Sequence, residues 1–174
     1  MICCVTGHRP KKFPFQRNDY SPEYNEYQVR LYTELDFLVK EGYTNFISGM
    51  AEGADMDFSE AVIEEQKDYK YEGYNITLEA ALPCPIKLPK NPSNLYYERD
   101  YLLKACNNIT IVSPTYHKGC MQKRNRYMVD SSDMVLAIWN GERSGGTYDT
   151  IKYAQKKGKP IRYIMLNKIL DLYN

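Results

Sequence analysis

Short apolar runs alternate with longer segments of helical periodicity along the whole chain. Continuous apolar character, typical of strands buried on both faces of a sheet, marks residues 2–5, 45–48, 77–82, 109–112, 134–139 and 160–164. Apolar residues spaced three or four apart predict helices at 23–41, 55–66, 95–106 and 147–157. A further short helix is expected around Arg124, Asn125 and Met128. Gly42 and Gly158 follow two of these segments, as is typical of helix ends.

This alternation predicts the α/β class, in the form of a single Rossmann-like, doubly wound, mainly parallel sheet of about six strands with helices on both faces. No linker, repeat or low-complexity segment divides the sequence, so residues 1–174 are expected to form one domain. Ligands of such sheets bind at the carboxyl ends of the strands, near the switch point of the topology. The loops 6–9, 49–55, 83–85, 113–114 and 140–146 all fall at that edge.

Glycine-bearing loops connect predicted strands to predicted helices. The segment 48–55 (SGMAEGAD) follows the second strand and 144–147 (SGGT) follows the fifth, while 6–9 (TGHR) follows the first. Glycine lets the backbone approach an anion closely, and free N–H groups at a helix N-terminus point at it. Their occurrence in one small domain favours a shared nucleotide-like ligand over unrelated turns.

The predicted ligand contacts are the glycines and polar residues of these loops. They are Thr6, Gly7, His8, Arg9, Ser48, Gly49, Gly53, Asp55, Asn140, Gly145, Gly146 and Thr147. Weaker candidates are Glu52, Pro83, Arg124 and Asp149. We expect no catalytic metal and no cofactor.

Several of these residues have two interpretations. Asp55 either caps its helix or contacts ribose hydroxyls, and Arg9 either binds a phosphate or pairs with Glu52 or Asp55. His8 is interpreted as a hydrogen-bonding residue, because no nucleophile has a matching spacing. Thr147 is able to cap its helix and contact a phosphate with the same hydroxyl. Glu52 either points to solvent or binds sugar hydroxyls, and solvent is favoured because a carboxylate repels a nearby anion.

The loop 10–22 holds two lysines, Phe13, Phe15, Arg17 and Tyr20. A loop of this length is either a functional cover over the site or a structural flap that packs its phenylalanines on the domain. The sequence favours neither interpretation.

Charge and composition narrow the choice of partners. The net charge is +1 without a basic run, which makes nucleic acid an unlikely partner. No segment is long and apolar enough for a membrane helix, so a cytoplasmic location without membrane contact is expected. The five cysteines lack C-x-x-C spacing, which favours reduced thiols over zinc or disulfides. The oligomeric state stays open, a homo-oligomer included.

The segments 6–10 (TGHRP), 48–55 and 145–147 (GGT) together resemble the SLOG superfamily, which joins the Smf/DprA proteins to the LOG cytokinin-activating enzymes. The similarity is greatest to the small bacterial YpsA-like branch and spans Ile2 to about Ile164. It implies a Rossmann-like sheet that binds a nucleotide or an ADP-ribose-type molecule, as a sensor or carrier.

The resemblance also implies rival functions. LOG enzymes hydrolyse the N-glycosidic bond of nucleoside monophosphates with a helix arginine and the glutamate of P-G-G-x-G-T-x-x-E. Here Arg124 stands near the arginine position, but the glutamate position falls on Thr150, and Asp149 would reach the pocket only from another helical direction. An enzyme acting at the N-glycosidic bond, of the LOG or deoxyribosyltransferase kind, is therefore one alternative to binding. A DprA-like module for single-stranded DNA is the other.

Overall fold

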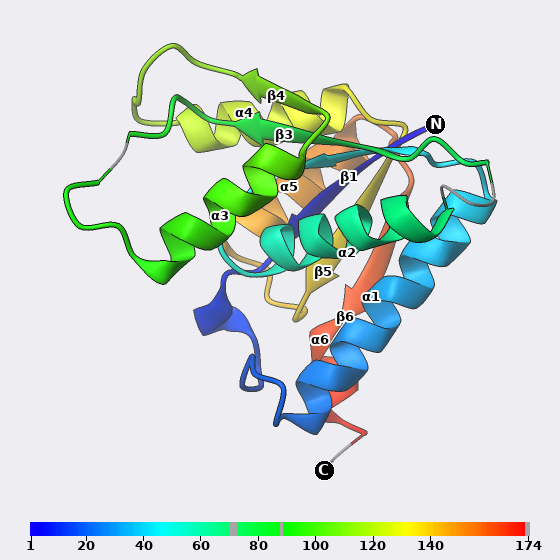
Figure 1. The fold of residues 1–174 in the computed structure, drawn as a ribbon. Coiled ribbons are helices and arrows are strands. Elements are labelled where there is room, and N and C mark those ends of the chain that lie inside the picture. Colours follow the sequence, from blue (N-terminus) through cyan, green and yellow to red (C-terminus); the bar gives the residue numbers. More distant parts are fainter. Residues whose placement is uncertain (70–72, 88, 173–174) are drawn as a thin grey trace.

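A computed structural model describes residues 1–69, 73–87 and 89–172 of the chain. Strands and helices alternate almost throughout (Figure 1). The strands are β1 (Ile2–Gly7), β2 (Asn45–Ser48), β3 (Thr77–Leu82), β4 (Asn108–Ile111), β5 (Met134–Trp139) and β6 (Ile161–Met165). The helices are the 3-10 turn η1 (Pro10–Lys12), α1 (Pro22–Lys40), α2 (Ala54–Tyr69), α3 (Asn94–Ala105), α4 (Cys120–Asp130), α5 (Gly145–Lys156) and α6 (Leu166–Leu170).

The six strands form one parallel sheet in the order β4-β3-β2-β1-β5-β6. This arrangement confirms the predicted α/β, Rossmann-like class. From β1 the chain adds strands in one direction to β4, and it then crosses back to place β5 on the other side of β1. The switch point therefore lies between β1 and β5, where a crevice opens beyond the carboxyl ends of the strands.

Two helical layers enclose the sheet (Figure 1). The larger core packs α1, α2, α3 and α6 against one face, through residues such as Tyr27, Phe58 and Ile169. The smaller core packs α4 and α5 against the other face, with Met128 and Ala154 among its buried members. Each crossover between parallel strands is right-handed, so helices on connections towards β4 cover one face of the sheet. Helices on connections towards β6 cover the other face. This division leaves α4 and α5 side by side next to the switch point.

Some elements differ from their predicted form. β1 continues through Thr6 and Gly7, because these residues pair in register with Ala137 and Ile138 of β5. β4 lies at a sheet edge and leaves Ile109 46% and Ile111 49% exposed, so it is not buried on both faces. The short helix α6 was not predicted, since its apolar residues continue directly from β6.

The loop before α1 packs on the larger core. Phe13 is buried, and its ring meets those of Phe15 and Tyr27 at centroid distances of 5.6 and 5.4 Å. Arg17 forms an ion pair with the buried Asp57 of α2. These contacts fit the structural-flap interpretation of the loop, while its lysines face the crevice described below.

Candidate anion-binding site

A cavity of about 220 Å³ lies at the switch point, beyond the carboxyl end of β1. Four parts of the chain contribute to its wall: the end of β1 with the following turn, the β2–α2 loop, α4, and the first turn of α5. Its lining includes Thr6, Gly7, His8, Arg9, Lys11, Lys12, Ala51, Asp55, Met121, Arg124, Asn125, Ser144, Gly145, Gly146 and Thr147. The cavity is thus at the place where a doubly wound sheet binds its ligand.

The N-terminus of α5 opens into this cavity. Its cap residue Ser144 makes no side-chain hydrogen bond to the helix, so the cap leaves the first N–H groups available to an acceptor in the cavity. A Cβ atom on Gly146 would meet nothing within 4 Å, which places open space directly beside this turn. The helix dipole favours negative charge at such a point.

Arg124 of α4 brings a buried guanidinium to the same cavity. Only 5% of the residue is exposed, and neither Nε nor Nη1 has a hydrogen-bond partner among the described residues. Its Nη1 lies 3.6 Å from Oδ2 of Asp55, so the two form an ion pair without a close hydrogen bond. A buried donor without an acceptor is costly, and an anionic ligand would supply that acceptor.

Burial and charge act against each other in this pair. Burial raises the pKa of the Asp55 carboxyl, while Arg124 and the N–H of Ala51 oppose that rise. Burial also lowers the pKa of Arg124; Asp55 opposes this effect and the positive charge of Arg9 adds to it. Two cations therefore face a cavity with one buried carboxylate, a balance that a bound anion would improve.

The β2–α2 loop holds Arg124 and the start of α2 in place. A Cβ atom on Gly49 would overlap the Arg124 guanidinium, so only glycine leaves room for it. Ser48 is fully buried and donates a 2.9 Å hydrogen bond to the carbonyl of Asp55. Gly53 has a φ of +96°, and a Cβ there would lie 2.6 Å from the His8 carbonyl oxygen. These loop residues support the cavity from behind.

A hydrogen-bond network fixes the opposite wall. His8 Nε2 lies 2.7 Å from Asn140 Oδ1, which also accepts the N–H of Glu142. Asn140 Nδ2 donates to the Lys12 carbonyl at 3.1 Å, while Thr147 Oγ1 donates to the Gly7 carbonyl at 2.9 Å. Because Asn140 Oδ1 is an acceptor, His8 Nε2 carries the proton. Burial lowers the pKa of His8, which favours the neutral ring.

Lys12 lies at the mouth of the cavity. Its Nζ is 2.8 Å from Glu142 Oε2 and would be 3.5 Å from a Cβ on Gly145, at the start of α5. Glu142 is also hydrogen-bonded to Ser144. The turn η1 is thereby joined to the β5–α5 loop across the cavity.

The structure brings together most, but not all, of the predicted ligand contacts. Those that line the cavity are Thr6, Gly7, His8, Arg9, Asp55, Arg124, Gly145, Gly146 and Thr147. Ser48, Gly49 and Asn140 hold lining residues from behind. Gly53 and Glu52 line a separate hollow beside α3, Asp149 lines a groove between α4 and α5, and Pro83 is absent from the lining.

Several lining residues were not among the predicted contacts. Lys11 and Lys12 directly follow Arg9 and Pro10, so their place after the first strand was the available signal. Asn125 and Met121 reach the cavity from α4, and only the fold of this helix over β1 reveals them. The lining carries Arg9, Lys11, Lys12 and Arg124 against a single carboxylate, Asp55, and it is therefore cationic.

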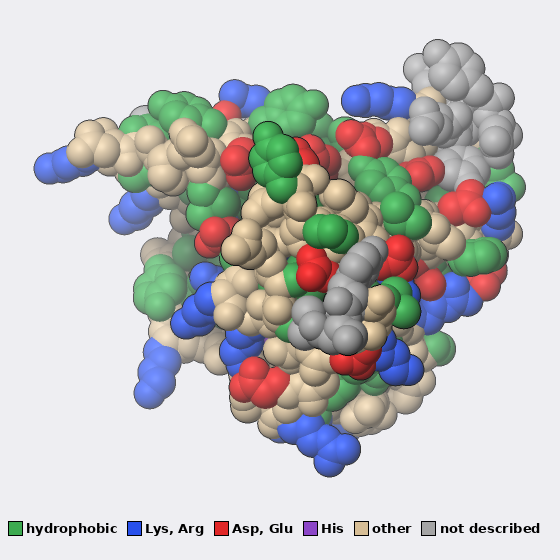
Figure 2. Space-filling view, turned by 90° about the horizontal axis from the view of Figure 1, so that it is seen from below, with side chains coloured by type: hydrophobic (Ala, Val, Ile, Leu, Met, Phe, Trp, Pro, Cys, Tyr) green, Lys and Arg blue, Asp and Glu red, His purple; other side chains and the backbone are tan. Residues whose placement is uncertain are grey.

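The face of the molecule seen from below carries charges of both signs (Figure 2). Figure 2 views the molecule from below, and Lys and Arg side chains are spread over this face with Asp and Glu between them. Within residues 1–69, 73–87 and 89–172, no helix is long and apolar enough to cross a membrane. The same residues contain no group of three or more His, Cys, Asp or Glu that could hold a metal ion.

Fold and cavity together define the class of Rossmann-like α/β proteins with a cationic cavity at the switch point. The model of the YpsA family, described as the YspA SLOG family, matches residues 3–169 of this chain. The chain belongs to this SLOG family, as its motifs predicted.

Individual relatives are distant. A UPF0398 protein of Bacillus cereus (strain G9842) is 23% identical over 181 residues, covering 98% of this chain and 94% of the relative. A UPF0398 protein of Bacillus thuringiensis (strain Al Hakam) is 23% identical over 168 residues, covering 93% and 86%. The chain thus corresponds to nearly the full length of these relatives.

A solved structure of DNA processing protein A from Helicobacter pylori has a similar fold, with a TM-score of 0.61 and 20% identity. The likeness covers 94% of this chain but only 64% of that protein, which was studied for its single-stranded DNA binding mode. At this identity the likeness establishes the fold alone.

Proposed function

We propose that this protein binds a nucleotide or a nucleotide-derived small molecule such as ADP-ribose, with a phosphate at the start of α5. The carrying observation is that the buried guanidinium of Arg124, whose Nε and Nη1 lack hydrogen-bond partners among the described residues, lines the same cavity as the uncapped N-terminus of α5. Arg124 and the first N–H groups of α5 donate to the phosphate, because both supply donors that lack acceptors. Arg9, Lys11 and Lys12 add positive charge at the mouth.

Binding of such a ligand stabilises the native state. In thermal unfolding, AMP, ADP or ADP-ribose at a hundred times its Kd adds roughly 2.7 kcal/mol. Gly146→Asp removes this shift while the protein stays folded, since the new carboxylate occupies the open space beside the helix start and repels the phosphate. Gly158→Ala, beyond the other end of α5, is the control and keeps the shift. Absence of any shift up to millimolar ligand, or equal loss in both variants, contradicts the proposal.

Binding is favoured over hydrolysis of the N-glycosidic bond. Thr150, at the position of the LOG glutamate, donates to the Gly146 carbonyl at 2.8 Å and accepts from Asn125 at 2.9 Å. A neutral hydroxyl held in this way neither activates water nor stabilises an oxocarbenium ion. Since such a group contributes about 10²–10⁴-fold in rate, release of free base from AMP, GMP or CMP is expected near the detection limit. Rapid release of free base would instead favour an enzyme in which Asp55 is the catalytic carboxylate.

Single-stranded DNA is the second candidate ligand. The structural neighbour was studied for its single-stranded DNA binding mode, which favours this ligand, and the cationic cavity would accept a backbone phosphate. We rank it below a small molecule because charges of both signs alternate on the surface in Figure 2. Fluorescence anisotropy with a labelled oligonucleotide separates the two: binding that is weaker than that of ADP supports a small-molecule site.

A further inference from the structure

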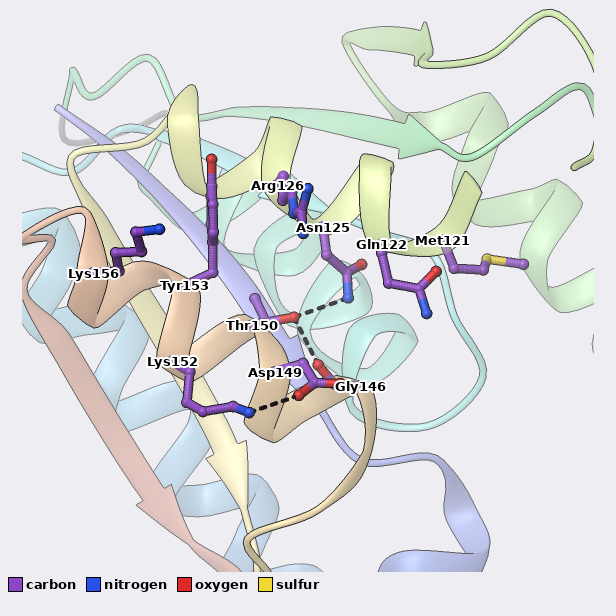
Figure 3. Close-up of a pocket in the computed structure, with 10 residues that line it drawn as sticks. All are labelled: Met121, Gln122, Asn125, Arg126, Gly146, Asp149, Thr150, Lys152, Tyr153 and Lys156. Carbon is purple, nitrogen blue, oxygen red and sulfur yellow. Dashed lines mark hydrogen bonds and ion pairs between the residues drawn. The ribbon is translucent and has the colours of Figure 1, made fainter. Parts of the chain in front are cut away.

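A larger groove of about 520 Å³ opens next to the anion cavity, between α4 and α5 (Figure 3). Its sides are Met121, Gln122, Asn125 and Arg126 of α4 and Gly146, Asp149, Thr150, Lys152, Tyr153 and Lys156 of α5. Met121, Asn125 and Gly146 also line the anion cavity. The two hollows therefore meet at the start of α5.

The anion cavity is small for a whole nucleotide. Pockets for organic ligands measure about 300–1,000 Å³, whereas this cavity measures about 220 Å³. It has room for the phosphate end of a nucleotide but not for the whole molecule. The adjoining groove offers the missing volume, and Gly146 lies at the passage without a side chain to block it.

The groove is also cationic. Arg126, Lys152 and Lys156 line it against one carboxylate, Asp149. Figure 3 shows Lys152 directed at Asp149, with its Nζ 3.1 Å from Oδ1. This pair balances itself, so Arg126 and Lys156 leave the groove with an excess of positive charge.

The second group of cations is set well apart from the first. An α-helix rises about 1.5 Å per residue, so Lys152 and Lys156 follow Gly146 by roughly 9 and 15 Å along α5. Long side chains on a helix lean towards its N-terminus, which shortens the span at the ammonium groups. A single phosphate at the start of α5 does not reach them, whereas a second phosphate further along the ligand would lie nearer to them.

We propose that the groove receives the distal part of the same ligand and that this part carries a second phosphate. The ligand class is then a dinucleotide-like molecule with two separate phosphates rather than a mononucleotide. This inference rests on the proposed function, because the first phosphate must lie at the start of α5.

Isothermal titration calorimetry with two probes tests the inference. The 5′-phosphorylated adenine dinucleotide pApA is expected to bind about tenfold or more tightly than AMP, because its second phosphate gains charged hydrogen bonds. Arg126→Gln and Lys156→Gln each weaken pApA binding and leave AMP binding unchanged. Lys168→Gln, which removes an exposed lysine of α6, is the matched control and changes neither affinity.

The possible outcomes separate a failure of this inference from a failure of the proposed function. If AMP and pApA bind equally well and the groove variants change neither, the inference is wrong while the proposed function stands. If AMP, ADP-ribose and pApA all fail to bind, both are wrong. Two further results overturn the inference alone. One is much tighter binding of a 5′-phosphorylated oligonucleotide of about twelve nucleotides, which indicates a strand as the ligand. The other is a dimer, seen by light scattering, that Lys156→Gln dissociates, which assigns the groove to a subunit interface.

Discussion

The β2–α2 loop and the β5–α5 loop look alike in sequence but differ in structure. Both follow a strand, carry glycines and open a helix, and both were predicted to hold a phosphate. In the β2–α2 loop the space beside each glycine is filled: the Arg124 guanidinium lies at Gly49, and the His8 carbonyl lies at Gly53. In the β5–α5 loop, Gly146 faces open space.

The helix starts differ in the same way. At α2, the N–H of Ala54 donates to the His8 carbonyl, and the N–H groups of Met56 and Asp57 donate to the Gly53 carbonyl. At α5, the cap residue Ser144 supplies no side-chain acceptor. A glycine loop before a helix thus serves either close packing of the chain on itself or access for a ligand, and the neighbouring backbone decides which.

The largest expected effect concerns stability, and it separates the two loops directly. Gly53→Ala forces a side chain into positive φ against a backbone carbonyl, and it is expected to lower the free energy of unfolding by roughly 1–3 kcal/mol. Gly146→Ala meets nothing and is expected to change it by less than about 0.5 kcal/mol. Urea denaturation measures both. Equal losses would mean that the two glycines do the same work.

Gly49→Ala tests whether packing in the β2–α2 loop positions Arg124 for the ligand at the start of α5. The new methyl group would overlap the Arg124 guanidinium and lie 2.7 Å from Asp55 Oδ2, so Arg124 must move. Loss of a charged hydrogen bond to phosphate is expected to weaken ADP binding about 10- to 100-fold. Calorimetric titration gives the affinity, and thermal unfolding confirms that the variant is folded. Unchanged affinity would remove Arg124 from the site.

The hydrophobic pattern predicted the sheet and most helices, because buried strands are short continuous apolar runs and amphipathic helices repeat apolar residues every three or four positions. The cavity was predictable only in outline. The place of Gly146 and Thr147 in the cavity could be predicted from a local motif. The packing of Arg124 against Gly49, by contrast, is a contact between residues 75 positions apart in the sequence. Arg124 was only a weak candidate for that reason. Lys12 was missed because its place at the mouth depends on Asn140 and Glu142.

Changes to the Lys12–Glu142 ion pair, at the mouth of the cavity, are expected to have a smaller effect on ligand affinity. Glu142 occupies one donor of a lysine that faces the proposed phosphate. Glu142→Gln is expected to tighten ADP binding a few-fold at low salt, because an exposed ion pair is weak and is screened by salt, and Lys12→Gln is expected to weaken it by a similar factor. Titrations at two salt concentrations measure both. Weaker binding by Glu142→Gln would show that Glu142 supports the site instead.

The smallest expected effect is a pH dependence at His8, on the wall between the loops. Burial lowers its folded-state pKa below the ordinary 6.5, while Asn140 opposes this shift. The unfolded chain therefore takes up a proton first as the pH falls, so the contribution of His8 is fully present above pH 6.5 and is lost as the pH drops through the folded-state pKa. Asp55 acts with the opposite sign, because its raised pKa makes the folded state more stable at low pH and less so as the pH rises.

A single substitution isolates the histidine from this background. Thermal unfolding between about pH 7.5 and pH 5 is expected to show a shallower loss of stability for His8→Gln than for the unmodified protein. The difference between the two curves removes the contribution of Asp55, which both share. His117→Gln, which replaces the exposed second histidine, is the control for the loss of an imidazole ring. An unchanged slope for His8→Gln would mean that protonation does not disturb the His8–Asn140 bond, and that this wall of the cavity accepts a charged ring.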